Sequence, residues 1–385
     1  MQLNDNWKNT IDAVPLSPFA DNVLEFFNDL SRQLTGVREY SDVATFGFWC
    51  RKAALLKEKA SYDDLNLRLG KGVVFHSTPS NVPINFAFSF AAGLLAGNAN
   101  IVRLPGRDFD QVAIITGAVN ELLAGKHANL TPYLCFVKYP SDKKLNDLFS
   151  SVCDVRIIWG GDATINELRR SPLKPRATEL TFADRYSIAV INADEYVKAA
   201  DKPKIARDFY NDTYFSDQNA CTSPGIIFWI GTGKEAAKEA FWGSVRALAR
   251  KKYDLAPVQA VGKLAAFYKA AASVAVSLID ADDCYVTRIG VGVNDVNDDL
   301  MRFKYNSGFY FEHDINALKD ILPVCGERLQ TLTYYGLTKE ELAEFFAIYK
   351  PKGIDRAVPM GRSMDFTLTW DGYDLIRQLS RKVML

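Results

Sequence analysis

One cysteine, Cys221, lies among small and polar residues directly before a predicted buried strand. Residues 215–225 read FSDQNACTSPG, and the apolar run 226–230 follows them. A thiol in this position is partly exposed and open to deprotonation by local dipoles, as a nucleophile requires. The other cysteines lie in apolar stretches or in turns without such surroundings. The pattern indicates a nucleophilic cysteine, although an inert thiol in a polar loop fits the same spacing.

A proline-containing loop follows the predicted strand at 72–75. It reads HSTPSNVP from His76 to Pro83, and α/β proteins place their sites at the carboxyl ends of parallel strands. Prolines fix the backbone on both sides of Asn81, whose amide is able to donate a hydrogen bond to a developing oxyanion. Asparagine is also a preferred helix N-cap, so a turn in which Asn81 only caps the next helix is the alternative.

Two arginines follow the predicted strand at 101–102. Arg103 and Arg107 flank the turn Leu-Pro-Gly, and a guanidinium binds phosphate oxygens in a bidentate fork. The segment therefore suits a phosphate, and the alternative is a solvated pair of surface charges.

A glycine pair separates the predicted strand at 155–159 from a helix. Gly160 and Gly161 precede Asp162, and glycines at such a turn let a pyrophosphate approach the helix N-terminus, where backbone N–H groups favour anions. The full dinucleotide fingerprint is absent, and Asp162 acting simply as the N-cap is the alternative reading.

Short apolar strands alternate with helical stretches from about residue 70 onward. We expect strands at 73–75, 101–102, 133–137, 155–159, 187–191, 226–230, 285–289 and 309–311. Such alternation predicts parallel sheets covered by helices on both faces. Because 385 residues are too many for one ordinary core, we expect two α/β domains, 1–186 and 187–353, with 354–385 completing the first.

Two helices have a clear apolar face. In the first, Ser17 is expected to be the N-cap, with Pro18 in the first turn. Its apolar face is predicted to consist of Val23, Phe27, Leu30 and Leu34. The face of the second is predicted to consist of Ala237, Phe241, Ser244 and Leu248. Both spacings follow the helical period.

The composition is that of an ordinary globular protein. Lysine plus arginine and aspartate plus glutamate number 46 each, which argues against nucleic acid or an anionic membrane as the main partner. The first residues lack the pattern of a secretory signal, and the apolar region 83–102 is too interrupted to span a bilayer. The six cysteines form no CxxC pair. We therefore expect a reduced, cytoplasmic protein with no metal centre.

Taken in order, these segments resemble the aldehyde dehydrogenase superfamily, and most closely the LuxC-type acyl-CoA (fatty acyl) reductase family. The resemblance is carried by HSTPSNVPINFAFSFAAGLLAGNANIVRLPGRDFDQ at 76–111, VRIIWGGDATINELRR at 155–170, DRYS at 184–187, SDQNACTSPGIIFW at 216–229 and GIDRAVPMGRSMDFTLTWDGYDLIRQLSR at 353–381. It implies an aldehyde dehydrogenase-like α/β fold, with two Rossmann-like parallel-sheet domains and an active-site cleft between them.

The resemblance also implies catalytic roles. Cys221 matches the acyl-accepting nucleophile, and Asn81 matches the asparagine that forms the oxyanion hole with the nucleophile's backbone N–H. Glu179 aligns with the glutamate that activates water in hydrolytic aldehyde dehydrogenases. The glycines that normally follow that glutamate are replaced here by TFA at 181–183, so the role of Glu179 is left open.

A nicotinamide cofactor is implied as well. The matching cofactor-binding residues are Ser77, Thr78, Pro79, Ser80, Arg103, Arg107, Gly160, Gly161 and Asp162. Arg103 falls where the superfamily usually has a lysine that contacts the adenosine ribose. An arginine there, with Arg107 nearby, favours the 2′-phosphate of NADPH over NADH.

The implied reaction is reduction of an acyl-CoA, or another acyl thioester, to an aldehyde by NADPH or NADH, with CoA as the leaving group. Two alternatives stay open. One is an aldehyde dehydrogenase that uses Glu179 as its base, and the other is a non-redox acyl carrier or transferase subunit. An acyl-activating synthetase or an acyl carrier protein is a candidate partner, and the superfamily implies a homo-oligomer.

Overall fold

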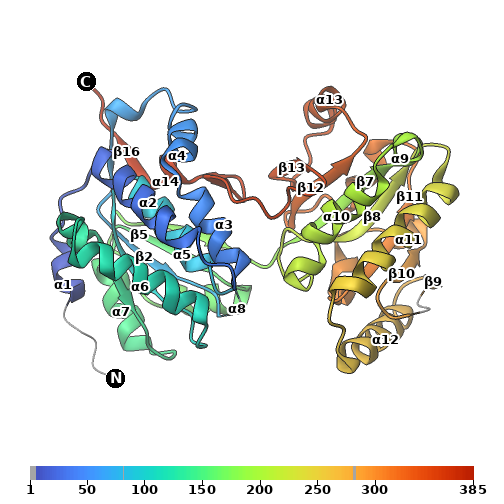
Figure 1. The fold of residues 1–385 in the computed structure, drawn as a ribbon, viewed down its shortest axis with the longest axis horizontal. Helices are drawn as coiled ribbons and strands as arrows, with labels where there is room; N and C mark the ends of the chain where they lie inside the picture. The colour runs from blue at the N-terminus through green and yellow to red at the C-terminus, as the bar shows by residue number, and fades with distance from the viewer. Residues whose placement is uncertain (1–5, 81, 281–282) are drawn as a thin grey trace. The chain divides into compact units, whose positions relative to one another are not determined.

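The computed structural model describes residues 6–80, 82–280 and 283–385, and the chain divides into two compact units (Figure 1). Unit 1 comprises the described residues up to Ala183 together with Phe366–Leu385, and unit 2 is Asp184–Asp365. Segment 354–365, expected in the first domain, belongs to unit 2. The reason is backbone pairing, because strand β13 (Arg356–Pro359) adds in parallel to β12 (Leu329–Tyr335) of unit 2.

The sheet of unit 1 has the strand order β4-β3-β2-β5-β6, and neighbouring strands run parallel. Its strands are β2 (Val73–Ser77), β3 (Ala99–Arg103), β4 (Leu134–Val137), β5 (Val155–Trp159) and β6 (Thr178–Phe182). The helices between them are α5 (Asn85–Leu95), α6 (Asp110–Ala124), α7 (Lys143–Val152) and α8 (Asp162–Arg169). The predicted strand–helix alternation is confirmed.

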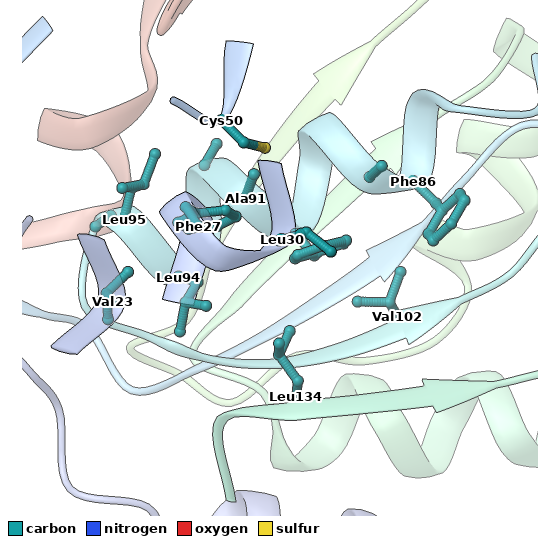
Figure 2. Close-up of a cluster of buried hydrophobic side chains, with 14 of the residues drawn as sticks. Val23, Phe27, Leu30, Cys50, Phe86, Ala91, Leu94, Leu95, Val102 and Leu134 are labelled. Carbon is teal, nitrogen blue, oxygen red and sulfur yellow. The ribbon is translucent and has the colours of Figure 1, made fainter. Parts of the chain in front are cut away.

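Each face of this sheet has its own core. Val74 packs with the helices α2 (Asp21–Leu34), α3 (Ser41–Trp49), α4 (Lys52–Lys59), α5 and α6, whereas its neighbours Val73 and Phe75 pack against α7. This follows from the alternation of side chains along a strand. Figure 2 shows residues from α2, α5 and the sheet meeting in the first of these cores.

Helix α2 buries the predicted face but begins later than expected. Val23, Phe27, Leu30 and Leu34 are all buried, as the spacing predicted. The N-cap position is Ala20 and not Ser17. The backbone N–H of Phe19 instead donates to Leu95 O (2.7 Å), at the end of α5, which holds the preceding residues outside the helix.

The sheet of unit 2 has the order β13-β12-β7-β8-β11-β10-β9, and its neighbours run parallel except for the antiparallel pair β10–β9. The strands not yet given are β7 (Tyr186–Asn192), β8 (Pro224–Ile230), β9 (Val276–Asp280), β10 (Thr287–Val291) and β11 (Phe309–Asp314). Strand β12, which lies between β13 and β7, was not expected from the sequence.

Helices cover both faces of this second sheet. One core contains α9 (Ala193–Lys198), α10 (Lys202–Asp212) and α11 (Lys234–Lys252), and the other contains α12 (Pro257–Ala271) and α13 (Lys339–Tyr349). The buried face of α11 is Ala237, Phe241, Val245 and Ala249, so the predicted positions Ser244 and Leu248 were wrong by one residue each. Trp242 is also buried beside Phe241, which rotates the apolar face toward Val245 and Ala249.

The C-terminal segment belongs to unit 1, where β16 (Ser380–Lys382) pairs antiparallel with β1 (Arg68–Gly70). It also carries β14 (Thr369–Trp370), β15 (Tyr373–Asp374) and α14 (Leu375–Leu379), while α1 (Asn6–Ile11) opens the described chain. Within the described residues, no helix is apolar and long enough to cross a membrane, and no cluster of potential metal ligands occurs.

Candidate active site

Cys221 lies in a turn between the short 3₁₀ helix η3 (Tyr214–Ser216) and β8 of unit 2. Its side chain is exposed, and four of the remaining cysteines in the described residues are buried. Burial raises the pKa of Cys135 to about 11 and that of Cys325 to about 12. Because the thiolate is the nucleophile, exposure singles out Cys221 as the reactive candidate.

Gln218 fixes the turn that carries this cysteine. The Gln218 side chain is buried, and its Nε2 donates to the carbonyl oxygens of Pro224 and Phe309, both at 3.1 Å. Its Oε1 accepts from the backbone N–H groups of Gly308 (3.0 Å) and Phe309 (3.3 Å). One side chain therefore ties the turn to the first residues of both β8 and β11.

Asp217 anchors the same turn from the other side. Its carboxylate accepts hydrogen bonds from the hydroxyl of Ser307 (2.8 Å), the amide of Gln259 (3.3 Å) and the hydroxyl of Tyr253. The pKa of Tyr253 is raised, mainly by burial and secondly by its hydrogen bond to the Asp217 carboxylate. Asp217 and Gln218 both have left-handed backbone conformations, with φ of 51° and 57°. Because such conformations are unfavourable outside glycine, these side-chain bonds must hold the turn in place.

Strand β7 supports the cysteine itself. The hydroxyl of buried Ser187 donates to the carbonyl oxygen of Cys221 (2.7 Å). Nothing in the sequence indicated a role for Asp217, Gln218 or Ser187. Their contacts lie up to 91 residues apart along the chain, so only the fold reveals them.

A cavity of about 120 Å³ borders Cys221 and is lined entirely by residues of unit 2. Lys304 and Asn219 at its rim are exposed, whereas Phe309 and Phe311 are buried. The buried part of the lining also contains polar side chains, Gln218 and Ser223, so the thiol stands beside a space of mixed polar and apolar surface.

The predicted cofactor-binding residues lie at one edge of the other sheet, in unit 1. Strands β3, β2 and β5 are neighbours, and the register aligns Ser77 with Arg103 and with Ile158. The carboxyl ends of these strands therefore bring the loop after β2, Arg103 and Gly160 together. The predicted oxyanion donor Asn81 lies outside the described residues.

Part of the loop after β2 helps to hold unit 1 together and is not free to bind a ligand. Ser77 is buried within the strand, and the Thr78 hydroxyl donates to Arg103 O (2.6 Å). His76 precedes Ser77 in the same strand. Its ring lies within hydrogen-bond distance of Ser89 Oγ (2.7 Å) and Asn100 Oδ1 (3.0 Å). Burial lowers the pKa of His76 to about 4, so this histidine is a neutral core residue at pH 7. Pro79 is half-buried and Ser80 is exposed.

Arg103 is oriented at the end of β3. Its guanidinium lies 4.7 Å from the ring centroid of Tyr139, which is itself held by a hydrogen bond from its hydroxyl to Asn146 Oδ1 (3.0 Å). Arg107 is exposed in the turn that follows. Both side chains are available at the edge where a phosphate was predicted to bind.

The glycine turn leads into helix α8, and its N-cap residue is Gly161 instead of Asp162, the alternative considered from the sequence. Gly161 is the N-cap position and offers no side-chain hydrogen bond, while Asp162 is the first helical residue. The reading of Asp162 as N-cap was therefore wrong. A Cβ atom at Gly161 would meet no atom within 4 Å, so the helix N-terminus faces open space, as close approach of a pyrophosphate requires.

Glu179 is engaged in ion pairs within unit 1. Its carboxylate accepts from Arg156 at 2.5 Å and from Arg169 at 2.8 Å, and the Arg156 side chain is only 3% exposed. Both carboxylate oxygens are therefore engaged by guanidinium groups of unit 1, Oε2 by Arg156 and Oε1 by Arg169.

The family model described as acyl-CoA reductase (LuxC) matches residues 53–273, which is more than half of the chain. The chain belongs to the LuxC family. Its match to the long-chain acyl-protein thioester reductase of Aliivibrio fischeri is 28% identical over 163 residues, 42% of the chain and 32% of that protein. The Vibrio harveyi protein of the same name is 23% identical over 81% of the chain and 63% of its own length. This LuxC-family chain thus matches less than two thirds of either relative.

The fold of this LuxC-family chain is that of the aldehyde dehydrogenases. A benzaldehyde dehydrogenase from Corynebacterium glutamicum superposes with a TM-score of 0.63 at 11% identity, over 98% of the chain and 86% of that structure. Betaine aldehyde dehydrogenase from Staphylococcus aureus gives 0.60 at 12% identity, over 96% and 78%. The predicted aldehyde dehydrogenase-like fold class is confirmed.

Proposed function

We propose that this chain reduces an acyl thioester to an aldehyde through an acyl group carried on Cys221. The observation that carries the proposal is the exposed thiol of Cys221, held in a cross-linked turn beside a cavity in a chain of the LuxC family. The acyl donor is an acyl-CoA, or an acyl group held on a carrier protein or a synthetase; the relatives' names specify an acyl-protein thioester.

The covalent steps balance without an activated water. Cys221 Sγ forms a bond to the thioester carbonyl carbon, the bond from that carbon to the departing sulfur breaks, and the departing thiolate takes up the proton lost by Cys221. A nicotinamide cofactor, when bound, would supply the hydride that reduces the acyl group. The bond from carbon to Sγ then breaks, which releases the aldehyde and restores the thiolate of Cys221.

The assay for this activity is aldehyde formation from an acyl-CoA with NADPH or NADH. We expect one aldehyde per reduced cofactor consumed, measured by derivatising the aldehyde and following cofactor absorbance. Cofactor consumption that yields a carboxylic acid, or no consumption with any thioester, would contradict the proposal.

Asn81 is the proposed donor to the oxyanion formed when Cys221 attacks. Its support is the family resemblance and its place in the sequence, in the segment between β2 and α5, since Asn81 itself lies outside the described residues. Asn81→Ala is expected to lower the acylation rate by about a hundredfold, the usual effect of removing one oxyanion donor. Stopped-flow release of free CoA measures this rate, and an unchanged rate would remove Asn81 from the mechanism.

NADPH is the proposed cofactor, and Arg103 is the proposed ligand of its 2′-phosphate. Because a charge-assisted hydrogen bond is worth about 1.5–3 kcal/mol, Arg103→Ala should lower kcat/KM with NADPH by roughly tenfold or more and change that with NADH little. The matched control is Arg176→Ala, an exposed arginine that precedes β6 and so lies toward the other edge of the sheet. Equal losses with both cofactors would argue against phosphate recognition by Arg103.

Glu179 is proposed to stabilise unit 1 and not to act as a base. Glu179→Gln removes the charge that pairs with buried Arg156, so it should lower the free energy of unfolding by about 3 kcal/mol while folded enzyme keeps its turnover. Chemical denaturation and the aldehyde assay test both parts. Glu167→Gln, on exposed α8 surface, is the matched control. Loss of turnover with unchanged stability would instead favour the alternative, an aldehyde dehydrogenase that uses Glu179.

A further inference from the structure

Helix α12 of unit 2 (Figure 1) has its apolar face turned outward. Val258 is 73% exposed, Val261 69% and Tyr268 64%, whereas the buried residues of this helix are Lys263 and Ala270. A surface helix normally does the reverse and buries its apolar stripe. Contiguous exposed apolar side chains usually mark a surface that another molecule covers.

Contacts on the inner face of α12 hold the helix in this orientation. The buried Lys263 side chain donates through Nζ to the carbonyl oxygens of Ser307 (2.7 Å) and Cys284. Gly262 lies against Tyr305, which leaves no room for a Cβ atom at that glycine. Rotation of the helix to bury its apolar stripe would break these contacts, so the stripe stays on the surface.

The exposed positions of the stripe follow one another in alternating steps of three and four residues. They are Val258, Val261, Ala265, Tyr268 and Ala272. This is the spacing of the a and d positions through which two helices pack along one seam. The buried Lys263 and Ala270 occupy the f positions of the same repeat, on the opposite side of the helix. The stripe therefore suits a second helix.

The seam is complementary in shape to a second copy of itself that runs antiparallel. With a twofold axis near Ala265, Val258 of one copy lies opposite Ala272 of the other. Val261 of each copy lies opposite Tyr268 of the other. Each larger side chain thus meets a smaller one, and every contact occurs twice, as an isologous interface requires.

The charges of the chain are compatible with this pairing. Lys269 is the charged residue nearest the seam, and it would lie beside residues 260–262 of the other copy, which are uncharged. Like charges therefore do not face each other across the seam. The whole chain has equal numbers of acidic and basic residues, so two copies carry no net charge that would keep them apart.

The apolar surface extends beyond the seam. Leu264 is 49% exposed beside it, and Leu278 of strand β9 is 42% exposed. Leu278 shares a face of its strand with Val276, which packs against the same core as Ala270 of α12. A second copy seated on α12 would cover apolar side chains of both elements.

We infer that α12 forms an interface with α12 of a second copy of this chain, related to the first by a twofold axis near Ala265. The inference goes beyond the proposed reaction, because it assigns the face through which two copies associate. It does not depend on which chemistry Cys221 performs.

The test is the molar mass of the full chain in solution, measured by light scattering after size-exclusion chromatography. We expect an assembly of at least two copies. Ala265→Glu places two carboxylates near the twofold axis and should halve the mass of the assembly, as should Ala265→Lys. Both replacements are good helix formers at an exposed position, so the circular dichroism spectrum should stay that of the wild type.

Mixing the two variants provides the sharper measurement. Equal amounts of Ala265→Glu and Ala265→Lys should restore the wild-type mass, because opposite charges then face each other across the axis. Ala240→Glu, the same change at an exposed residue of α11, is the matched control and should keep the wild-type mass.

Four results would overturn the inference. A wild-type chain that runs as a single copy would leave this face to a different partner. An unchanged mass in Ala265→Glu would mean that the copies meet elsewhere, and a mixture that does not recover would mean that α12 does not meet itself across an axis. An equal loss in Ala240→Glu would show that the effect is not specific to the seam. Acylation of Cys221 is measured separately, so none of these results decides the proposed function.

Discussion

Cys221→Ala is expected to abolish aldehyde formation, with a loss of at least about 10⁴-fold, because removing a covalent nucleophile eliminates the acyl intermediate altogether. The structure indicates that this substitution leaves the stability of unit 2 unchanged. The Cys221 side chain is exposed, whereas the turn is held by Gln218, Asp217 and Ser187 through contacts that do not use the thiol. The thermal midpoint of the variant should therefore match the wild type.

The matched control for this change is Cys284→Ala. Cys284 is half-buried in the same unit and is the other cysteine in the described residues that is not fully buried. Its replacement should leave turnover unchanged. Full activity in Cys221→Ala, or equal losses in both variants, would mean that another group carries the acyl chain or that no covalent intermediate forms.

Gln218→Leu is expected to destabilise unit 2 by about 4 kcal/mol and to reduce acylation of the molecules that remain folded. The replacement leaves the carbonyls of Pro224 and Phe309 and the N–H groups of Gly308 and Phe309 without their side-chain partner. Each buried polar group left unpaired costs about 1–3 kcal/mol. The left-handed backbone at position 218 also loses the bonds that hold it.

Two measurements separate these effects. Urea denaturation gives the free energy of unfolding, and the rate of CoA release per folded molecule reports how well the cysteine turn is positioned. Gln33→Leu, the same change at an exposed residue of α2, is the matched control. A destabilised Gln218→Leu enzyme with a normal acylation rate would show that Gln218 supports the fold but not the position of Cys221.

Much of the fold was predictable from the sequence, because apolar strands such as 155–159 are short, continuous and bounded by turn residues. Strand β12 was missed although its LQTLTYY sequence is rich in β-branched and aromatic residues. Its neighbour β7 comes from a distant part of the chain, whereas its other neighbour β13 follows it after helix α13. Helix starts were the other weak point, since the position of Ser17 depends on a bond between Phe19 and Leu95.

The candidate site was predictable only where one residue type carries the chemistry. Cys221 stood out because its neighbours are small and polar, and Arg103 and Gly161 because they follow strands. Gln218 gave no such signal, since its four backbone partners are fixed by the fold. The ion pair of Glu179 with Arg156 was equally unpredictable from the sequence, because the two residues become partners only through the pairing of β5 with β6.

The central claim, an acyl group carried on Cys221 and removed by reduction, is tested most directly by intact mass. The protein would be incubated briefly with an acyl-CoA. One portion would then be digested to locate the acyl group, and the intact remainder would be given NADPH or, separately, NADH. We predict a mass increase equal to the acyl group, located on Cys221, that disappears with release of one aldehyde when the reduced cofactor is added. An adduct that neither cofactor discharges would contradict the reductase and favour an acyl carrier or transferase. An adduct on any residue other than Cys221 would contradict the assignment of the nucleophile.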